Sequence, residues 1–80
     1  MPYIPYSQRL VVQQTGPQKA GDLNYQLTRL LLWYLKAHGT SYQTINDCVG
    51  ALENCKAEFY RRVVAPYEDR AISRNGDIYE

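Results

Sequence analysis

The chain has 80 residues, a formal net charge of +1 and an aromatic content of 12%. A net charge this small gives no electrostatic basis for binding a nucleic-acid polymer. No apolar run approaches the roughly 18–20 residues that cross a bilayer, so we expect no membrane partner.

The few cysteines and the single histidine argue against metal or disulfide chemistry. Cys48 and Cys55 are separated by roughly 10 Å along an expected helix, which is too far for a disulfide between them. His38 is the one histidine, and the chain has no Cys-x-x-Cys motif. We therefore expect no metal site and no cofactor.

The first part of the chain contains loop signals on both sides of one short helix. Prolines and tyrosines punctuate residues 1–6, which we expect to form an extended arm. Residues 7–14 predict a short helix with Ser7 at its N-cap, because a serine hydroxyl can accept a hydrogen bond from a free backbone N–H. Glycine and proline in residues 15–21 then predict a loop.

An amphipathic pattern predicts a long helix over residues 22–38. Asp22 is expected to cap its start, and Gly39 is expected to end it. Its expected core face has helical spacing and consists of Leu23, Leu27, Leu30, Leu31, Tyr34 and His38.

A second long helix is predicted over residues 41–65, capped by Thr40 or Ser41. Pro66 lacks a backbone N–H and disfavours helical geometry in the residue before it, so we expect a kink or break there. A short helix over residues 66–75 should follow. The apolar stripe of the second helix consists of Ile45, Cys48, Val49, Leu52, Cys55, Phe59 and Val63.

These elements predict an all-α fold in a single small domain, residues 1–80. The two long helices should form an antiparallel hairpin flanked by short terminal helices. A chain this short buries only about 60% of its unfolded surface and is marginally stable alone. We therefore expect a homodimer or a higher homo-oligomer, associated as a helical bundle.

The face opposite the expected core of the first long helix carries an unusual amount of aromatic area. Tyr25, Leu32 and Trp33 lie there, interleaved with Arg29 and Lys36. Two interpretations stay open. A dimer partner or the N-terminal arm covers this face, or a planar ligand stacks on Trp33 or Tyr25 while a basic side chain meets a phosphate.

A second candidate surface lies in residues 58–69, where aromatic rings, paired arginines and an acidic pair follow one another. Glu58 and Arg61 fit a solvated helix pair, which leaves Arg62 as the better candidate for a bidentate contact. Lys56 lies within the apolar stripe, where its ammonium either extends to water or points into a cavity or at an acidic partner. The candidate ligand residues of this surface, around the expected break, are Tyr60, Arg62, Tyr67 and Asp69.

Signals of catalysis are absent from the sequence. It contains no Gly-rich phosphate loop, no serine nucleophile motif and no histidine–carboxylate cluster. We therefore expect a binding protein rather than an enzyme.

Several sequence words resemble a family of small helical proteins from phages, prophages and their metagenomic relatives, described only as a domain of unknown function. The resemblance covers roughly residues 21–79 and the first four residues. It implies a virus-encoded accessory protein in the cytoplasm of a bacterial host. The words that carry it are MPYI at residues 1–4, GDLNY at 21–25, YQTIND at 42–47, VGALE at 49–53, EFYRRVVAPYED at 58–69 and NGD at 75–77.

Small phage proteins without catalytic residues include anti-defence sponges, and this chain is similar to them in size and in its aromatic and basic residues. The likeness implies sequestration of a nucleotide-derived immune signal, of the ADP-ribose type or a cyclic nucleotide, with Asn24 as a further ligand residue. The alternative is a protein-interaction module, or an accessory protein of phage replication or packaging, that binds a host or phage protein through the aromatic face.

Overall fold

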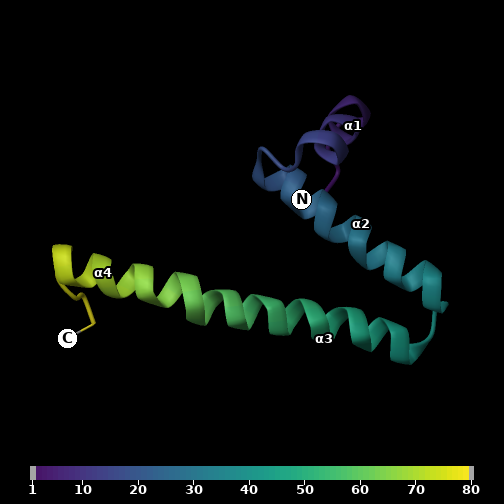
Figure 1. Ribbon diagram of the computed structural model, residues 1–80. Coiled ribbons are helices and arrows are strands. Elements are labelled where there is room, and N and C mark those ends of the chain that lie inside the picture. The colour runs from purple at the N-terminus through teal and green to yellow at the C-terminus, as the bar shows by residue number, and fades with distance from the viewer. Residues whose placement is uncertain (1, 80) are drawn as a thin grey trace. The chain divides into compact units, whose positions relative to one another are not determined.

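The computed structural model describes residues 2–79, and every regular element in them is helical (Figure 1). This confirms the all-α class. Met1 of the expected arm and Glu80 of the expected tail lie outside the described residues. The elements in chain order are α1 (Tyr6–Thr15), α2 (Ala20–His38), α3 (Tyr42–Phe59), the π-helix η1 (Tyr60–Val64) and α4 (Ala65–Asn75).

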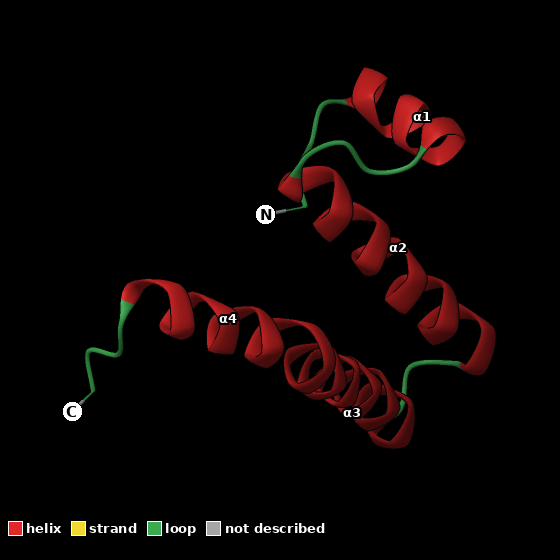
Figure 2. Cartoon of the chain, turned by 60° about the vertical axis from the view of Figure 1, so that its left-hand side comes forward, coloured by secondary structure: helices red, strands yellow, loops and turns green. Residues whose placement is uncertain are grey.

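The chain divides into two compact units, residues 1–48 and 49–80. The first unit holds α1, α2 and the first turns of α3. Within it, α1 lies against the start of α2 (Figure 2). The second unit holds the rest of α3, followed by η1 and α4, and the ribbon runs through these three elements without a loop (Figure 1).

Local sequence signals set the helix ends. Gly39 ends α2 with φ of 84°, a conformation that costs little for a residue without Cβ, and its N–H donates to the carbonyl oxygen of Leu35. Ser41 caps α3, because its Oγ accepts a hydrogen bond of 3.1 Å from the backbone N–H of Thr44. The predicted stop of α2 and the Ser41 cap are therefore confirmed.

The start of α2 differs from the prediction. The helix begins at Ala20, so Asp22 lies in its first turn and is not the N-cap. Its carboxylate accepts hydrogen bonds from Gln8 Nε2 at 3.0 Å and from the backbone N–H of Gln18 at 3.1 Å. Asp22 is 1% exposed, and the positive end of the helix dipole further favours its charge. The aspartate thus fastens α1 and the preceding loop to α2.

Of the expected kink or break at Pro66, the break is wrong, because the helix continues through the proline. Ala65, directly before it, keeps right-handed helical angles of −61° and −46°. Its N–H donates to the carbonyl oxygen of Tyr60, five residues back, and this wider turn is the π-helix. In an α-helix the proline ring would clash with the carbonyl of Arg62. The extra residue in the turn relieves that clash, so the chain needs no break.

The buried interior is smaller than the sequence pattern predicts. Among residues 2–79 the buried apolar side chains are Val12 on α1 and Tyr25 on α2. The expected core stripes of both long helices remain largely exposed, because within each unit no element covers them. The exposed members of these stripes are Leu23, Leu27, Leu30, Tyr34, Ile45, Val49, Leu52, Phe59 and Val63.

Within residues 2–79, no helix combines the length and the apolar character that crossing a bilayer requires.

Candidate ligand-binding site

Tyr25, one of the predicted ligand residues, is held by α1 in the first unit. Its side chain is 9% exposed, and its hydroxyl accepts a hydrogen bond of 3.2 Å from Gln13 Nε2. The guanidinium of Arg9 lies over its ring, 5.6 Å from the centroid. Tyr25 is therefore covered by α1, which is neither the arm at residues 1–6 nor a dimer partner, the two covers that the first interpretation named.

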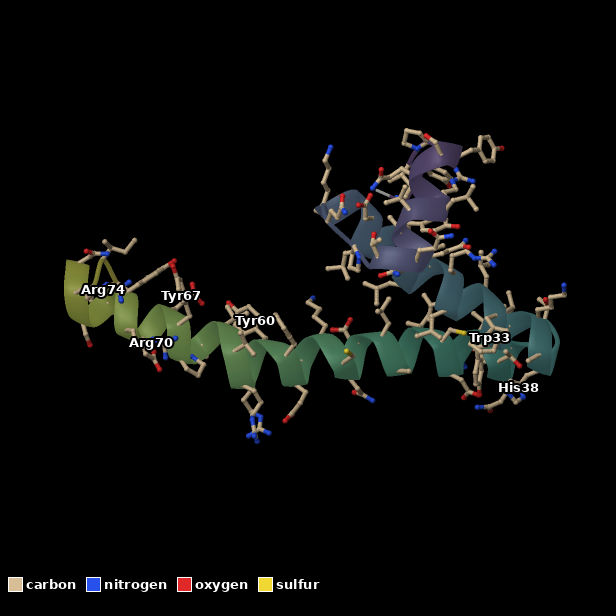
Figure 3. All side chains as sticks on the ribbon, turned by 45° about the horizontal axis from the view of Figure 1, so that its top comes forward. Trp33, His38, Tyr60, Tyr67, Arg70 and Arg74 are labelled. Carbon is tan, nitrogen blue, oxygen red and sulfur yellow. The ribbon has the colours of Figure 1, made fainter. Side chains whose placement is uncertain are left out.

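Trp33 lies about two turns further along α2, and its side chain is exposed to solvent. Its side chain is 72% exposed. Figure 3 shows Trp33 and His38 on the C-terminal half of this helix. Beside Trp33 and Tyr25 the surface of the first unit is hollowed, with a volume of about 420 Å³ that opens to solvent. The residues that line this hollow are Gln13, Tyr25, Gln26, Arg29, Leu30 and Trp33.

Some polar groups that line this hollow already form hydrogen bonds within the chain, and others are available to a ligand. Gln13 Nε2 donates to Tyr25, and Gln26 Nε2 donates to the carbonyl oxygen of Val12 at 3.2 Å. Neither amide oxygen accepts a hydrogen bond from another group of residues 2–79. The exposed guanidinium of Arg29 forms no ion pair in the described part of the chain. The hollow thus offers two acceptors, one cation and an open indole face.

This combination suits a flat ligand that carries an anionic group. An aromatic base stacks on an exposed indole, and a guanidinium binds phosphate through two parallel N–H donors. Amide oxygens such as those of Gln13 and Gln26 accept hydrogen bonds from exocyclic amines. The arrangement has the chemistry to hold such a ligand, and it presents no nucleophile paired with a base.

Asn24, a further predicted ligand residue, is exposed on α2 and is engaged locally. Thr28 Oγ1 lies 2.8 Å from the carbonyl oxygen of Asn24 and 3.3 Å from its Oδ1. Asn24 does not line the hollow.

The other four predicted residues belong to the second unit. Tyr60 and Arg62 lie in η1, while Tyr67 and Asp69 lie in α4. The hydroxyl of Tyr60 donates a 3.3 Å hydrogen bond to Glu68, and Arg70 lies 5.9 Å from the centroid of the Tyr67 ring.

The charged side chains of this unit differ in whether they form ion pairs. Arg61 pairs with both carboxylate oxygens of Glu58, at 2.7 Å and 3.0 Å, which confirms the predicted solvated pair. Arg62 and Asp69 form no ion pair within residues 2–79. Lys56 approaches Glu53 only to 4.0 Å and is well exposed.

Two residues of the hollow, Gln13 and Gln26, were missed by sequence reasoning. They join the site because α1 packs on α2, and no local motif reports that contact. Leu30, expected in the core, instead lines the hollow.

A separate polar cluster joins the end of α2 to the start of α3. The hydroxyl of Tyr34 donates to Asp47 Oδ2 at 3.0 Å, and Gln43 Nε2 donates to the other carboxylate oxygen at 2.7 Å. The rings of Tyr34 and His38 lie 4.4 Å apart. The hydrogen bond to Asp47 raises the pKa of Tyr34, because ionising the phenol would remove the donor and place two negative charges together.

No group of three histidine, cysteine, aspartate or glutamate side chains that could hold a metal ion comes together in the described residues.

Comparison with known proteins places the chain in a family. A family model described as a domain of unknown function, DUF6899, matches residues 1–78. The chain belongs to the DUF6899 family. No curated protein matches the sequence, and no solved structure matches it either. Membership in DUF6899 covers both units and supplies no activity, so the functional argument stands on the site itself.

Proposed function

We propose that this DUF6899 chain is a non-catalytic binding protein that holds a nucleotide-type ligand in the hollow beside Trp33. The observation that carries the proposal is the exposed indole of Trp33 next to the guanidinium of Arg29, which forms no ion pair within residues 2–79. An aromatic ring left open to water beside a free cation is suited to a flat, negatively charged partner.

Each part of such a ligand has a counterpart in the hollow. Stacking of one base on an aromatic side chain contributes about 1–3 kcal/mol. The Arg29 guanidinium would bind a phosphate oxygen pair, and the amide oxygens of Gln13 and Gln26 would accept from an amino group of the base. The protein would bind the ligand and release it chemically unchanged.

The biological role that we propose is sequestration of a nucleotide-derived immune signal, of the ADP-ribose type or a cyclic nucleotide. The chain would be phage-encoded and would act in the cytoplasm of the infected bacterium. The resemblance to phage-associated proteins and the chemistry of the hollow support this role.

Self-association belongs to the same proposal, together with an antiparallel hairpin of the two long helices. The exposed stripes of apolar side chains support association, since such faces are usually buried in a stable assembly. Two contacts inside the first unit support the hairpin. Tyr34 bonds to Asp47, and the thiol of Cys48 lies 3.9 Å from the carbonyl oxygen of Leu31.

Release of small molecules from the purified chain tests ligand capture. The protein is incubated with ADP-ribose, cyclic nucleotides and a bacterial metabolite extract, desalted and denatured, and the released compounds are identified by mass spectrometry. Trp33→Ala should abolish capture. Tyr42→Ala is the matched control, because Tyr42 is an exposed aromatic outside the hollow and its removal should leave capture unchanged. A clean blank from the wild-type chain contradicts the proposal.

A second candidate function is a protein-interaction module, favoured by the number of exposed apolar side chains on α2 and α3. It predicts that Trp33→Ala abolishes the capture of a host or phage protein, whereas no small molecule is released from the wild-type chain. The two candidates are therefore separated by the wild-type chain, which releases a small molecule under the first and none under the second.

A further inference from the structure

In the second unit, α3, η1 and α4 form one continuous helical run, and one side of it carries the cation Lys56 and the anion Glu68. The 3.3 Å hydrogen bond from Tyr60 to Glu68 places these two residues on the same side of the helix. Lys56 precedes Tyr60 by four residues, about one turn, and so lies on that side as well. The edge therefore runs from Lys56 through Tyr60 to Glu68.

The π-helix is what brings Lys56 and Glu68 into line. In an uninterrupted α-helix, residues twelve positions apart point roughly 120° away from each other. The extra residue in the η1 turn rotates everything after it back by about 100°. Lys56 and Glu68 then differ by only about 20° and stand roughly 16 Å apart along the axis.

Beside this edge runs an exposed apolar stripe. It consists of Leu52, Phe59, Val63 and Tyr67, all of which are exposed. In the part of the second unit that the structure describes, residues 49–79, no other helix is present to cover them. An isolated helix gains too little from its own backbone hydrogen bonds to be stable, so this stripe requires a partner surface.

We propose that the partner is a second copy of this chain, paired antiparallel, with Lys56 of each copy opposite Glu68 of the other. A twofold axis near Arg62 produces both ion pairs at once, because Lys56 and Glu68 lie equally far from it along the chain. Phe59, Val63 and Tyr67 of the two apolar stripes meet between the two ion pairs. This pairing rests on the proposed function, whose self-association it makes specific.

Charge complementarity selects this orientation over the parallel one. In a parallel pair, Lys56 would face Lys56 and Glu68 would face Glu68, which repel. The exposure of Lys56, and its distance of 4.0 Å from Glu53, leave the ammonium available for a carboxylate of another chain. Lys56 thus has an acidic partner, the Glu68 of a second copy.

Charge reversal in the full chain tests the pairing. Sedimentation equilibrium should give a dimer for the wild type at micromolar concentration. Lys56→Glu or Glu68→Lys alone should raise the dimer Kd by about tenfold, since each replaces two attractions with two repulsions. The double variant K56E/E68K should restore the wild-type Kd. Lys19→Glu, a matched reversal at the exposed lysine directly before α2, should leave the Kd unchanged.

Three results would overturn the pairing: a wild-type monomer at 100 μM, an unchanged Kd in Lys56→Glu, or a double variant as weak as the single ones. Ligand capture is measured on the same samples by mass spectrometry. Capture that persists while charge reversal has no effect removes only the pairing and leaves the proposed function in place. Absent capture with a rescued dimer removes the ligand and leaves the pairing.

Discussion

The hydroxyl of Tyr60 donates a hydrogen bond of 3.3 Å to the carboxylate of Glu68, across a π-helical turn that ends just before Pro66. The two residues are eight positions apart, so the bond spans about two turns of helix. Its presence means that the proline does not separate α3 from α4. Instead, the proline sets the direction in which the α4 side chains point.

Pro66→Ala tests whether the proline orients the α4 side chains, because it should raise helix content and weaken the dimer. Alanine removes the clash that the π turn relieves, so the helix should become regular and more stable, because proline costs about 3 kcal/mol in a helix interior. Glu68 would then rotate away from the Lys56 edge. We predict higher helix content by circular dichroism in dilute solution and a weaker dimer by sedimentation.

The control for this prediction is Pro17→Ala, which changes a proline in the loop before α2 and should not alter the dimer Kd. A Pro66→Ala dimer that is as tight as the wild type would show that the π turn does not orient the interface.

Asp22 fastens α1, and its removal should be costly. Asp22→Ala leaves the Gln18 N–H without its buried acceptor and removes the bond from Gln8, so we predict a loss of about 2 kcal/mol in the free energy of unfolding. Urea denaturation measures it, and hydrogen exchange should show faster exchange in α1. Asp69→Ala, at an exposed aspartate, should change stability by less than about 0.5 kcal/mol. Equal effects of the two substitutions would contradict the role of Asp22.

Tyr34 gives a pH-dependent contribution to stability. Its pKa is raised in the folded state, chiefly by the hydrogen bond to Asp47. A raised pKa means that the folded chain holds the phenol proton more tightly, so the stabilisation is full below about pH 10 and is lost as pH rises through the folded pKa. Chemical-shift titration of the tyrosine Cζ atoms should show the raised pKa, with Tyr34→Phe to assign the signal.

The neutral variant Asp47→Asn supplies the control for Tyr34. Asparagine keeps an acceptor oxygen and removes the negative charge, so the pKa of Tyr34 should fall towards its ordinary value. An unchanged Tyr34 pKa in Asp47→Asn would show that the carboxylate is not its cause.

The parts of the fold that depend on nearby residues were predictable from sequence. Gly39 and Ser41 mark helix ends through their own backbone and side-chain geometry, and the structure has both as predicted. Asp22 was misassigned, because a capping preference is a local signal and its actual partners include Gln8, fourteen residues away. At Pro66 two local rules favoured a break. A third possibility, a wider turn, satisfied the same constraints.

The candidate site was predicted only in part, for the same physical reason. The aromatic face of α2 was visible in the sequence, and Trp33 lies open on it. The packing of α1 decided which aromatic residue would be covered, and it brought Gln13 and Gln26 to the hollow. Contacts of this kind depend on how two helices meet, which helical periodicity alone does not encode.

The Arg29→Ala variant distinguishes specific binding of a phosphate-bearing ligand from non-specific hydrophobic binding to the aromatic face. Arg29→Ala removes the cation from the hollow while leaving Trp33 exposed, so we predict that affinity for a phosphate-bearing ligand falls by roughly tenfold to a hundredfold. Affinity for an uncharged aromatic compound should not change. Isothermal titration with ADP-ribose and with adenosine measures both, and equal losses for the two compounds would remove Arg29 from the site.

The most direct measurement of ligand capture is the fluorescence of Trp33, which is the chain's one tryptophan and lies at the hollow. The protein is titrated with ADP-ribose and with cyclic nucleotides while the indole emission is followed. We predict that at least one of these compounds changes the emission and saturates at one ligand per chain, and that Arg29→Ala weakens the effect. Emission that stays constant across all of them, together with no small molecule released on denaturation, would contradict this prediction.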